Sequence, residues 1–491
     1  MTDRSGLLLA ALLALLAFSF QGTRGLWEPD EGRYATVGLN MLESGDWLVP
    51  RLDREHPHLT KPPLTYWAIA ASVATFGRTE WAVRLPMALA FVLTGVLVHA
   101  LGRRLVPARP WLPALVWGMS LLPFAIANVA STDGLLALFE TLAMLGFVAA
   151  WTNPPERRRG WLRLMWLGFG LAFLTKGPPG LLPLLAMLGY SAFCDRRLLR
   201  QVFEPLGLLL FAVVAFSWYA VLVAQDPERL RYLLGYEVVD RIFTAEHDRN
   251  SAWYDAFGVY LPTLLVGALP WWPLALAAAG GPRRAWHTLR ERQRSGDRSW
   301  ALLGWWLLLP LAVFCLARSR LHTYLLPLFV PLSLMFARPL ARWPWLTARR
   351  LAGIAAATAI AFVVLKAVVA HRSHDRDARW IATELGRVVD LASIDEIVFV
   401  TMRPQYGLHL YLGKNIEGIQ LDEVGLIYSR ILSHEDLCEE YAERERNIYA
   451  MKLHREAEFR RAAANCGTFR VERIGEYFAD GETIALYRPI R

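Results

Sequence analysis

The sequence predicts an all-α polytopic membrane protein with a small soluble α/β domain at its C-terminal end. Of its 491 residues, 55% are hydrophobic and 20 are Trp, whereas soluble domains are about 45–50% apolar. Apolar blocks that approach the ~20 residues needed to cross a bilayer recur along the first three quarters of the chain. From about residue 376 the apolar runs shorten and charged residues become frequent. The chain therefore divides into a membrane part and a soluble tail.

The apolar blocks predict about eleven membrane spans. The first, Leu7–Phe20, is followed by no small-residue cleavage site, so we expect an uncleaved helix rather than a signal peptide. The expected spans are 7–20, 82–101, 111–129, 134–151, 161–175, 178–193, 206–224, 257–279, 300–317, 321–337 and 351–370.

Arginine clusters in alternate connections predict the orientation. The clusters contain Arg103, Arg104 and Arg109; Arg157, Arg158, Arg159 and Arg163; Arg196, Arg197 and Arg200; Arg283, Arg284, Arg290, Arg292, Arg294 and Arg298; and Arg338, Arg342, Arg349 and Arg350. By the positive-inside rule these loops and the N-terminus are cytoplasmic, and an odd number of spans places the tail outside. The net charge of +9 is thus explained by topology, and nucleic acid is rejected as a partner.

The predicted domains are 1–375, a transmembrane catalytic domain, and 376–491, an extracytoplasmic α/β domain. Within the first, 27–80 is an extracytoplasmic juxtamembrane loop with helix-like pieces at 30–43 and 64–76 that can lie flat at the interface.

The tail shows strand patterns and two cysteines. The predicted strands are 394–401 and 447–454, the second followed by a charged helix, and a hairpin turns at Asp480-Gly481. Cys438 and Cys466 can pair if the tail lies in an oxidising compartment, and the absence of CxxC argues against structural zinc. Nothing in the tail indicates catalysis.

Charged residues concentrate directly after the first span. Asp30 and Glu31 follow Pro29 at a helix start, where acids favour the helix dipole, but one acid would suffice for that. We therefore favour a functional interpretation. Arg33 and Tyr34 share a helical face with Asp30, and a local salt bridge and an anion-binding cluster are equally compatible with this spacing.

Lys61 lies in a Thr-Lys-Pro-Pro sequence, where the prolines prevent a helix from forming across it. A rigidly held ammonium suits a phosphate, and an interfacial lysine that snorkels to water is the alternative. His56 and His58 are spaced too weakly to predict a metal site, so no metal ligand is assigned, although a divalent metal is left open.

Further polar residues occur at the outer ends of later spans. Asp133 follows Ser131 and Thr132, which compete with it for the helix N-cap. Lys176 occupies a matching position between two other spans, Arg241 lies among apolar and aromatic residues of the loop 225–256, and Tyr324 starts a later span. Together these residues fit a lipid phosphate and a reaction that needs a base.

The sequence resembles the lipid-carrier-dependent GT-C glycosyltransferases in a series of ordered motifs. These are D-E-x-R-Y-A, G-D-W-x-x-P and K-P-P-L, then L-T-K-G at 174–177 and S-R-L-H-T-Y-L-L-P at 319–327. The bacterial lipid A aminoarabinose transferases, which are related to the protein O-mannosyltransferases, are the most similar group. The resemblance covers roughly residues 1–370. It differs at Thr60, where those enzymes tend to have Glu, and at His322, where they tend to have Pro.

The resemblance implies a polyprenyl-phosphate sugar as donor, a lipid or glycan acceptor in the cell envelope, and a multi-pass protein of the inner membrane. It implies that Asp30 acts as base or acceptor activator and that Asp133 is the second acid. The residues implied to hold the carrier phosphate, or to lie near it, are Lys61, Arg241, Tyr324, Arg33, Tyr34 and Lys176. Attack opposite the phosphate would invert the anomeric centre. A protein O-mannosyltransferase, a lipid-linked sugar transporter and a non-catalytic scaffold are the competing hypotheses.

Overall fold

The computed structural model of the 491-residue chain describes residues 4–231, 250, 252–294, 297–372, 374–421, 437–438, 440, 446–467 and 470–490. The chain divides into two compact units. We call Met1–Ser19 with Pro86–Ala367 the helical unit, and Phe20–Leu85 with Val368–Arg491 the mixed unit. Residues 20–85 thus group with the C-terminal residues, whereas the predicted division places them with the membrane domain.

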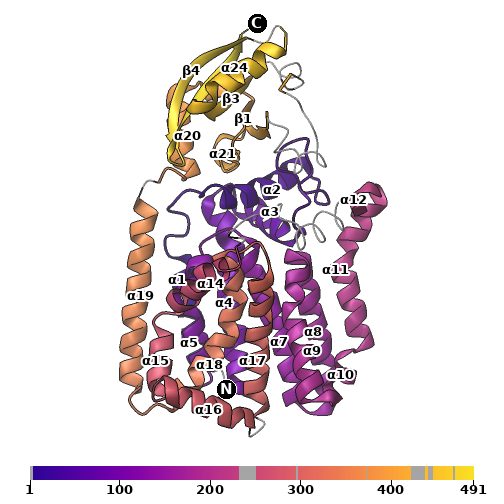
Figure 1. The fold of residues 1–491 in the computed structure, drawn as a ribbon, viewed down its shortest axis with the longest axis vertical. Helices are drawn as coiled ribbons and strands as arrows, with labels where there is room; N and C mark the ends of the chain where they lie inside the picture. The colour runs from indigo at the N-terminus through magenta and orange to yellow at the C-terminus, as the bar shows by residue number, and fades with distance from the viewer. Residues whose placement is uncertain are drawn as a thin grey trace. The chain divides into compact units, whose positions relative to one another are not determined.

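The helical unit is a bundle of mostly long helices (Figure 1). Its described helices are α1 (Arg4–Phe18), α4 (Glu80–Leu105, whose first residues belong to the mixed unit), α5 (Leu112–Gly118), α6 (Leu121–Ile126), α7 (Thr132–Thr152), α8 (Pro155–Lys176), η1 (Pro178–Leu181), α9 (Leu182–Cys194), α10 (Arg196–Val202), α11 (Pro205–Gln225), α12 (Glu228–Arg231), α14 (Asp255–Gly267), α15 (Trp271–Ala278), α16 (Pro282–Arg294), α17 (Arg298–Leu316), η3 (His322–Leu328), α18 (Phe329–Arg342) and α19 (Ala348–His371).

A helical segment overlaps each expected span, but the count of about eleven spans is not confirmed. Among the described residues six helical segments are long and apolar enough to cross a bilayer, or seven if α14 and α15, which meet at 75°, form one span. The other segments are short, broken or charged. The expected span 111–129 is split into α5 and α6, and 178–193 starts as a 3-10 turn at two prolines.

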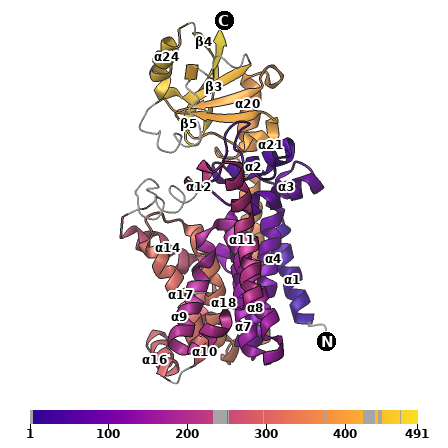
Figure 2. The ribbon, with the colours of Figure 1, turned by 90° about the vertical axis from the view of Figure 1, so that its right-hand side faces the viewer.

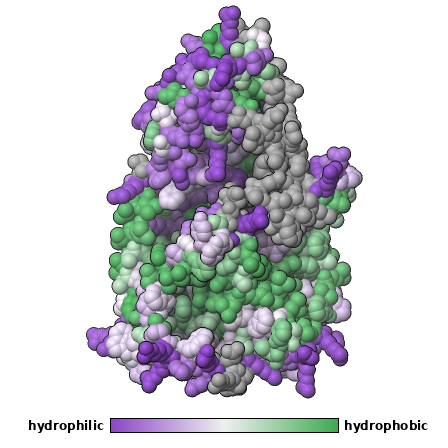
Figure 3. Space-filling model, in the orientation of Figure 1, coloured by the Kyte–Doolittle hydropathy of each residue, from purple (hydrophilic) through white to green (hydrophobic). Residues whose placement is uncertain are grey.

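Apolar side chains cover the outside of the helical unit. In α11, Leu209 and Val213 are both 57% exposed, and in α19 Ile360 is 64% exposed. A space-filling view shows a broad hydrophobic surface over the helical unit (Figure 3). Helices that are apolar even where they face outward are typical of membrane spans. The chain is therefore a multi-pass membrane protein.

The arginine-rich helices α10 and α16 lie at one end of the helical unit in both ribbon views (Figures 1 and 2). The hairpin of α7 and α8 turns at Asn153 and Pro154, directly before three of the clustered arginines, Arg157 to Arg159. Because the two helices are antiparallel neighbours, Asp133 at the start of α7 and Lys176 at the end of α8 meet at the far end of the hairpin.

A buried lysine joins the first and last helices of the helical unit. Lys366 of α19 donates hydrogen bonds from Nζ to the carbonyl oxygens of Leu16, at 3.1 Å, and Ala17, at 2.7 Å. These carbonyls belong to the last turn of α1, where the helix itself offers no donors, although the Ser19 hydroxyl also donates to Leu16 O at 3.5 Å. The lysine therefore acts as the C-terminal cap of α1.

The mixed unit combines the juxtamembrane helices with a five-stranded sheet. Its helices are α2 (Asp30–Ser44), α3 (Leu64–Phe76), α20 (Ala378–Val388), η4 (Leu391–Ser393), α21 (Leu408–Leu412), η6 (Leu453–Arg455) and α24 (Glu456–Asn465). Its strands are β1 (Glu396–Val400), β2 (Asn415–Ile419), β3 (Asn447–Lys452), β4 (Arg470–Ala479) and β5 (Glu482–Ile490), in the order β2-β1-β3-β5-β4.

The predicted α/β character of the tail is confirmed. Strand β1 is parallel to β2 and β3, and β4 and β5 form the expected antiparallel hairpin. Leu385 of α20 packs on one face of the sheet with Ile397, and Phe459 of α24 packs on the other with Val398 (Figure 2). The two helices cover opposite faces because alternate residues of β1 point to opposite sides.

Backbone hydrogen bonds explain why residues 20–85 group with the tail. The amide of Glu28 donates to Arg376 O at 2.9 Å, and the amide of Ala378 donates to Leu26 O at 2.8 Å. The hydroxyl of Thr36 in α2 donates to Tyr406 O at 2.6 Å. The segment before α2 is thus held by the chain that follows α19.

Cys438 and Cys466 form a disulfide that closes a loop with a sequence separation of 28 residues, and Cys194 and Cys315 are free. We predict that thiol labelling of the unfolded, unreduced protein finds two thiols, and four after reduction. The closed loop is expected to stabilise the domain by about 3.5 kcal/mol on the chain-entropy estimate. Four reactive thiols without reductant would contradict the pairing.

Candidate functional site

Asp133 and Lys176 form a buried ion pair in the helical unit. Nζ of Lys176 contacts Oδ1 of Asp133, and their side chains are only 9% and 7% exposed. Lys176 is the last residue of α8, and Gly177 after it adopts a φ of +73°, which favours glycine. The turn at Gly177 therefore ends the helix and leaves the lysine at its end, facing α7.

The competition for the N-cap of α7 is settled in favour of Ser131. Its hydroxyl accepts the hydrogen bond from the amide of Asp133 at 3.4 Å. Since the serine supplies the cap, the carboxylate of Asp133 is available to Lys176.

Tyr324 completes this group. Nζ of Lys176 lies 4.3 Å from the centre of the Tyr324 ring, which is a cation–π distance. The tyrosine is part of η3 and contacts Phe314 of α17, with ring centres 6.2 Å apart. Three elements far apart in the sequence, α7, α8 and η3, thus bring an acid, an amine and a phenol together.

Glu140 is a buried acid near this group that the sequence analysis missed. It is 4% exposed and follows Asp133 by seven residues, two turns further along the same face of α7. A lone acid inside an apolar span is the signal that could have identified it.

A small apolar pocket begins beside the Asp133 group. Gly134, the neighbour of Asp133, and Leu326, two residues after Tyr324, line it together with Met87, Phe91, Thr94, Trp117, Pro123, Ile126 and Ala127. Its lining suits hydrocarbon rather than a polar ligand.

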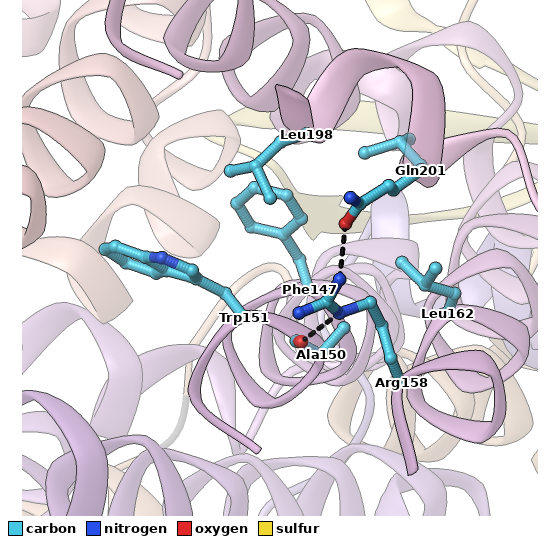
Figure 4. Close-up of a pocket in the computed structure, with 8 residues that line it drawn as sticks. Phe147, Ala150, Trp151, Arg158, Leu162, Leu198 and Gln201 are labelled. Carbon is cyan, nitrogen blue, oxygen red and sulfur yellow. Dashed lines mark hydrogen bonds between the residues drawn. The ribbon is translucent and has the colours of Figure 1, made fainter. Parts of the chain in front are cut away.

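A second pocket lies elsewhere in the helical unit (Figure 4). Arg158 crosses it and donates to Gln201 Oε1 at 2.7 Å and to Ala150 O at 3.2 Å. Phe147, which lines it, follows Asp133 by fourteen residues, or about 21 Å along α7. No candidate site residue lines this pocket, and we interpret it as a packing feature at the arginine-rich end.

The loop before η3 is fixed by Arg320, which is 3% exposed. Its guanidinium donates to the carbonyl oxygens of Asn250, Ala252 and Cys315 at 2.6–3.0 Å. His322 shares a 2.6 Å hydrogen bond with the hydroxyl of Thr263. Both side chains position the backbone that carries Tyr324.

In the mixed unit, Asp30 pairs with Arg33 at 2.7 Å along α2. The side chains of Asp30 and Arg33 are 50% and 28% exposed, so both remain accessible. The guanidinium of Arg33 lies 5.4 Å from the ring centre of Tyr34, and that ring is 5.8 Å from Tyr66 of α3. The predicted local salt bridge is therefore present, together with an aromatic neighbour.

Glu31 has a structural position. Its carboxylate contacts Arg24 and accepts hydrogen bonds from Arg84 at 2.8 and 2.9 Å and from the amide of Trp27 at 3.0 Å. Burial alone would raise the pKa of Glu31, but the two guanidinium groups outweigh it and hold the pKa far below its usual range. The two adjacent acids therefore differ: Glu31 is enclosed in an ion-pair cluster, and Asp30 is accessible.

Glu28 is a partly exposed residue with an enclosed carboxyl group, and the sequence did not single it out. Burial raises its pKa well above the usual range, and the amide of Gly407 donates to its Oε1. A Cβ on Gly32 would lie 2.5 Å from both carboxyl oxygens. Glycine is therefore required where α2 passes this carboxyl group.

Lys61 donates from Nζ to the carbonyl oxygen of Thr60 at 2.8 Å and is partly buried. His58 and Thr60 share a 2.8 Å hydrogen bond, and His56 lies 3.0 Å from Asp53. Within the described residues neither histidine belongs to a group of three potential metal ligands.

The structure thus brings together Asp133, Lys176 and Tyr324 in the helical unit, and Asp30, Arg33 and Tyr34 in the mixed unit, which also carries Lys61. The candidate Arg241 lies outside the described residues. Each unit holds an acid, a basic side chain and a tyrosine.

The known proteins that this chain is similar to are sugar transferases. A family model described as dolichyl-phosphate-mannose-protein mannosyltransferase matches residues 60–220. The fold matches the crystal structure of ArnT from Cupriavidus metallidurans bound to undecaprenyl phosphate, with a TM-score of 0.75 and 20% identity. The match covers 99% of this chain and 98% of that one. An Archaeoglobus fulgidus oligosaccharyltransferase matches with a TM-score of 0.56 and 12% identity, over 100% of this chain and 74% of its own.

The more particular similarity is to aminoarabinose transferases. The undecaprenyl phosphate-alpha-4-amino-4-deoxy-L-arabinose arabinosyl transferase 2 of Sodalis glossinidius is 37% identical over 336 residues, which are 67% of this chain and 58% of that protein. The corresponding enzyme of Edwardsiella ictaluri is 34% identical over 64% of this chain and 55% of its own length. The chain thus spans less than two thirds of these relatives. The resemblance inferred from the motifs is confirmed, and the fold is that of ArnT.

Proposed function

We propose that this protein is a glycosyltransferase that moves a sugar from a polyprenyl-phosphate donor to an envelope lipid, with 4-amino-4-deoxy-L-arabinose as the sugar and lipid A as the acceptor. The observation that carries this proposal is the buried pair of Asp133 and Lys176 beside Tyr324, at the end of the α7–α8 hairpin away from the clustered arginines. The similarity to enzymes named for this transfer supports the sugar and its carrier.

The reaction needs positive charge at the leaving phosphate. When the bond between the anomeric carbon and the phosphate oxygen breaks, the carrier departs as a phosphate monoester and its charge increases. Lys176 in the helical unit and Lys61 and Arg33 in the mixed unit are candidates to stabilise that charge, and Arg241 is a fourth.

The acceptor oxygen needs a carboxylate. Asp30 is accessible and held by Arg33, so it suits the role of base or acceptor activator. Asp133 is enclosed and faces Lys176, so it suits the role of orienting that amine. Attack from the side opposite the phosphate forms the new carbon–oxygen bond in one step and inverts the anomeric centre.

The proposed location is the inner membrane, with the site on the extracytoplasmic side. The arginine-rich connections support this orientation. The disulfide of Cys438 and Cys466 supports an oxidising compartment for the tail.

A protein O-mannosyltransferase is the second candidate, because the matching family model is described by that activity. The donor distinguishes the two. Purified protein in liposomes is expected to transfer aminoarabinose from its undecaprenyl-phosphate carrier to lipid A, detected as a mass increase of lipid A. Transfer of mannose to a peptide, with lipid A unchanged, would favour the second candidate.

Replacing Asp30 by alanine is expected to lower the transfer rate by about 10²–10⁴, the range for losing a general base. Membrane insertion and apparent Tm should not change, since half of the side chain is exposed. The matched control is Glu384→Ala, because Glu384 forms the same i,i+3 pair with Arg387 on α20 of the same unit. Normal transfer by folded Asp30→Ala protein would remove Asp30 from the mechanism.

A further inference from the structure

Three buried glutamates converge in the mixed unit, on residues that the proposed transfer does not use. Glu396 begins β1, Glu417 lies in β2, and Glu440 follows the disulfide residue Cys438 by two positions. They are 1%, 2% and 0% exposed. One carboxylate oxygen from each lies within 4.8 Å of the other two.

The sheet register explains the convergence. Glu396 lies opposite Asn415 of β2 and Asn447 of β3 in the two parallel ladders. Glu417 follows Asn415 by two residues, so both point to the same face as Glu396. This is the face covered by α24, so the polar group is enclosed by apolar packing.

Asn447 is a buried polar side chain beside these carboxylates. It is 1% exposed, and its Nδ2 donates to Glu440 Oε1, which places the amide against the carboxylates. Its Oδ1 is buried and accepts no hydrogen bond from the part of the chain that the structure describes. A buried amide oxygen without a donor is costly unless it binds a water or a cation.

Like charges at this spacing repel. Burial, followed by the charges of Glu440 and Glu396, raises the pKa of Glu417 to about 10, and burial also raises the pKa of Glu396. Three buried carboxyl groups this close together can all be ionised only beside a counter-charge.

We propose that Glu396, Glu417, Glu440 and Asn447 bind a hard divalent cation such as Ca²⁺. One oxygen from each of the three carboxyl groups lies within 4.8 Å of the others, so one cation can contact all three at the 2.3–2.6 Å typical of calcium ligands. All the donors are oxygens, which suit Ca²⁺, Mg²⁺ or Mn²⁺ rather than zinc. The sulfur atoms of Cys438 and Cys466 are joined in a disulfide and are not free to act as ligands.

The test uses the full-length protein in detergent after removal of metals with a chelator. Calcium, magnesium or manganese is then added separately, and the bound metal is counted by mass spectrometry after desalting. We expect one cation per chain, with a rise in apparent Tm, in the wild type. Glu417→Gln and Asn447→Ala should lose stoichiometric binding. Asp133→Asn should retain it, which separates this site from the proposed transfer site.

The matched control is Glu482→Gln, which removes a partly exposed acid of the same sheet that pairs with Lys452. Glu417→Gln should have an apparent Tm equal to or above that of the metal-free wild type, because an amide replaces a carboxyl group that burial already disfavours as an anion. Equal binding by Glu417→Gln and Glu482→Gln, or no binding by the wild type, would overturn the proposal.

Discussion

Replacing Lys176 by alanine is expected to lower the rate of sugar transfer by at least about 10²-fold, the scale for losing one preorganised charge at a reacting phosphate. The loss should appear mainly in kcat if the amine acts on the departing phosphate, and mainly in KM if it only binds the donor. The measurement is initial transfer rate against donor concentration in liposomes. Lys452→Ala, which removes a partly exposed lysine paired with Glu482 at 2.8 Å, is the control.

A purely structural role for this pair gives a different result. Breaking a buried ion pair by removing one partner typically costs 3–5 kcal/mol, whereas neutralising both partners costs much less. Lys176→Met and Asp133→Asn should therefore each lower the apparent Tm, and the double variant should regain much of it. We expect the double variant to remain inactive. Recovery of transfer together with stability would show that the pair serves only folding.

Replacing Glu31 by glutamine is expected to destabilise the mixed unit by about 3–5 kcal/mol, because it leaves Arg24 and Arg84 buried without their shared anion. Arg84 is 1% exposed and Arg24 is 8% exposed, so water cannot replace the carboxylate. The measurement is the apparent Tm from tryptophan fluorescence at pH 7.

The pH dependence checks the cause. The pKa of Glu31 is lowered in the folded protein, so its stabilising contribution is complete above the unfolded pKa of about 4.3. It is lost as the pH falls from there toward the folded pKa. The Tm difference between wild type and Glu31→Gln should therefore be constant from pH 5 to 7 and shrink below pH 4.

Glu28→Gln is the matched control for Glu31→Gln, since the carboxyl group of Glu28 is enclosed in the same segment. Burial raises the pKa of Glu28 in the folded protein. Above the unfolded-state pKa the carboxyl group ionises more readily in the unfolded chain than in the folded protein, so it lowers stability there. The glutamine variant should therefore match or exceed the wild-type Tm at pH 8. Equal destabilisation by the two variants would assign the effect to packing rather than charge.

Hydrophobic periodicity predicted where helices and strands occur in this protein better than it predicted which of them pack together. The helices at 30–43 and 64–76 match α2 and α3 within one residue at each end, and the strands at 394–401 and 447–454 contain β1 and β3. Strand β2 was missed, since its sequence NIEGI holds Asn, Glu and Gly, which are rare in strands. Pairing with β1 holds this segment in the sheet despite its weak preference for strand structure.

The candidate site was predicted by residue type but not by pairing. Asp133 and Lys176 were both singled out, yet they are 43 positions apart, and no local pattern joins them. The functional interpretation of the Asp30–Glu31 pair did not separate the two acids. Only the structure shows Glu31 between two arginines, one of them in the first turns of the membrane helix α4. Arg84 was overlooked because it stands inside an otherwise apolar run.

The contact of Lys366 with the last carbonyls of α1 has a consequence for biosynthesis. The ammonium that satisfies Leu16 and Ala17 is encoded 349–350 residues later. During translation α1 therefore enters the membrane with its terminal carbonyl groups still dependent on water or lipid head groups. Lys366 can reach these oxygen atoms only after α19, the last helix of the helical unit, has been synthesised. Truncation before residue 366 should accordingly increase amide hydrogen exchange and proteolysis at the end of α1, even though the sequence of α1 is complete.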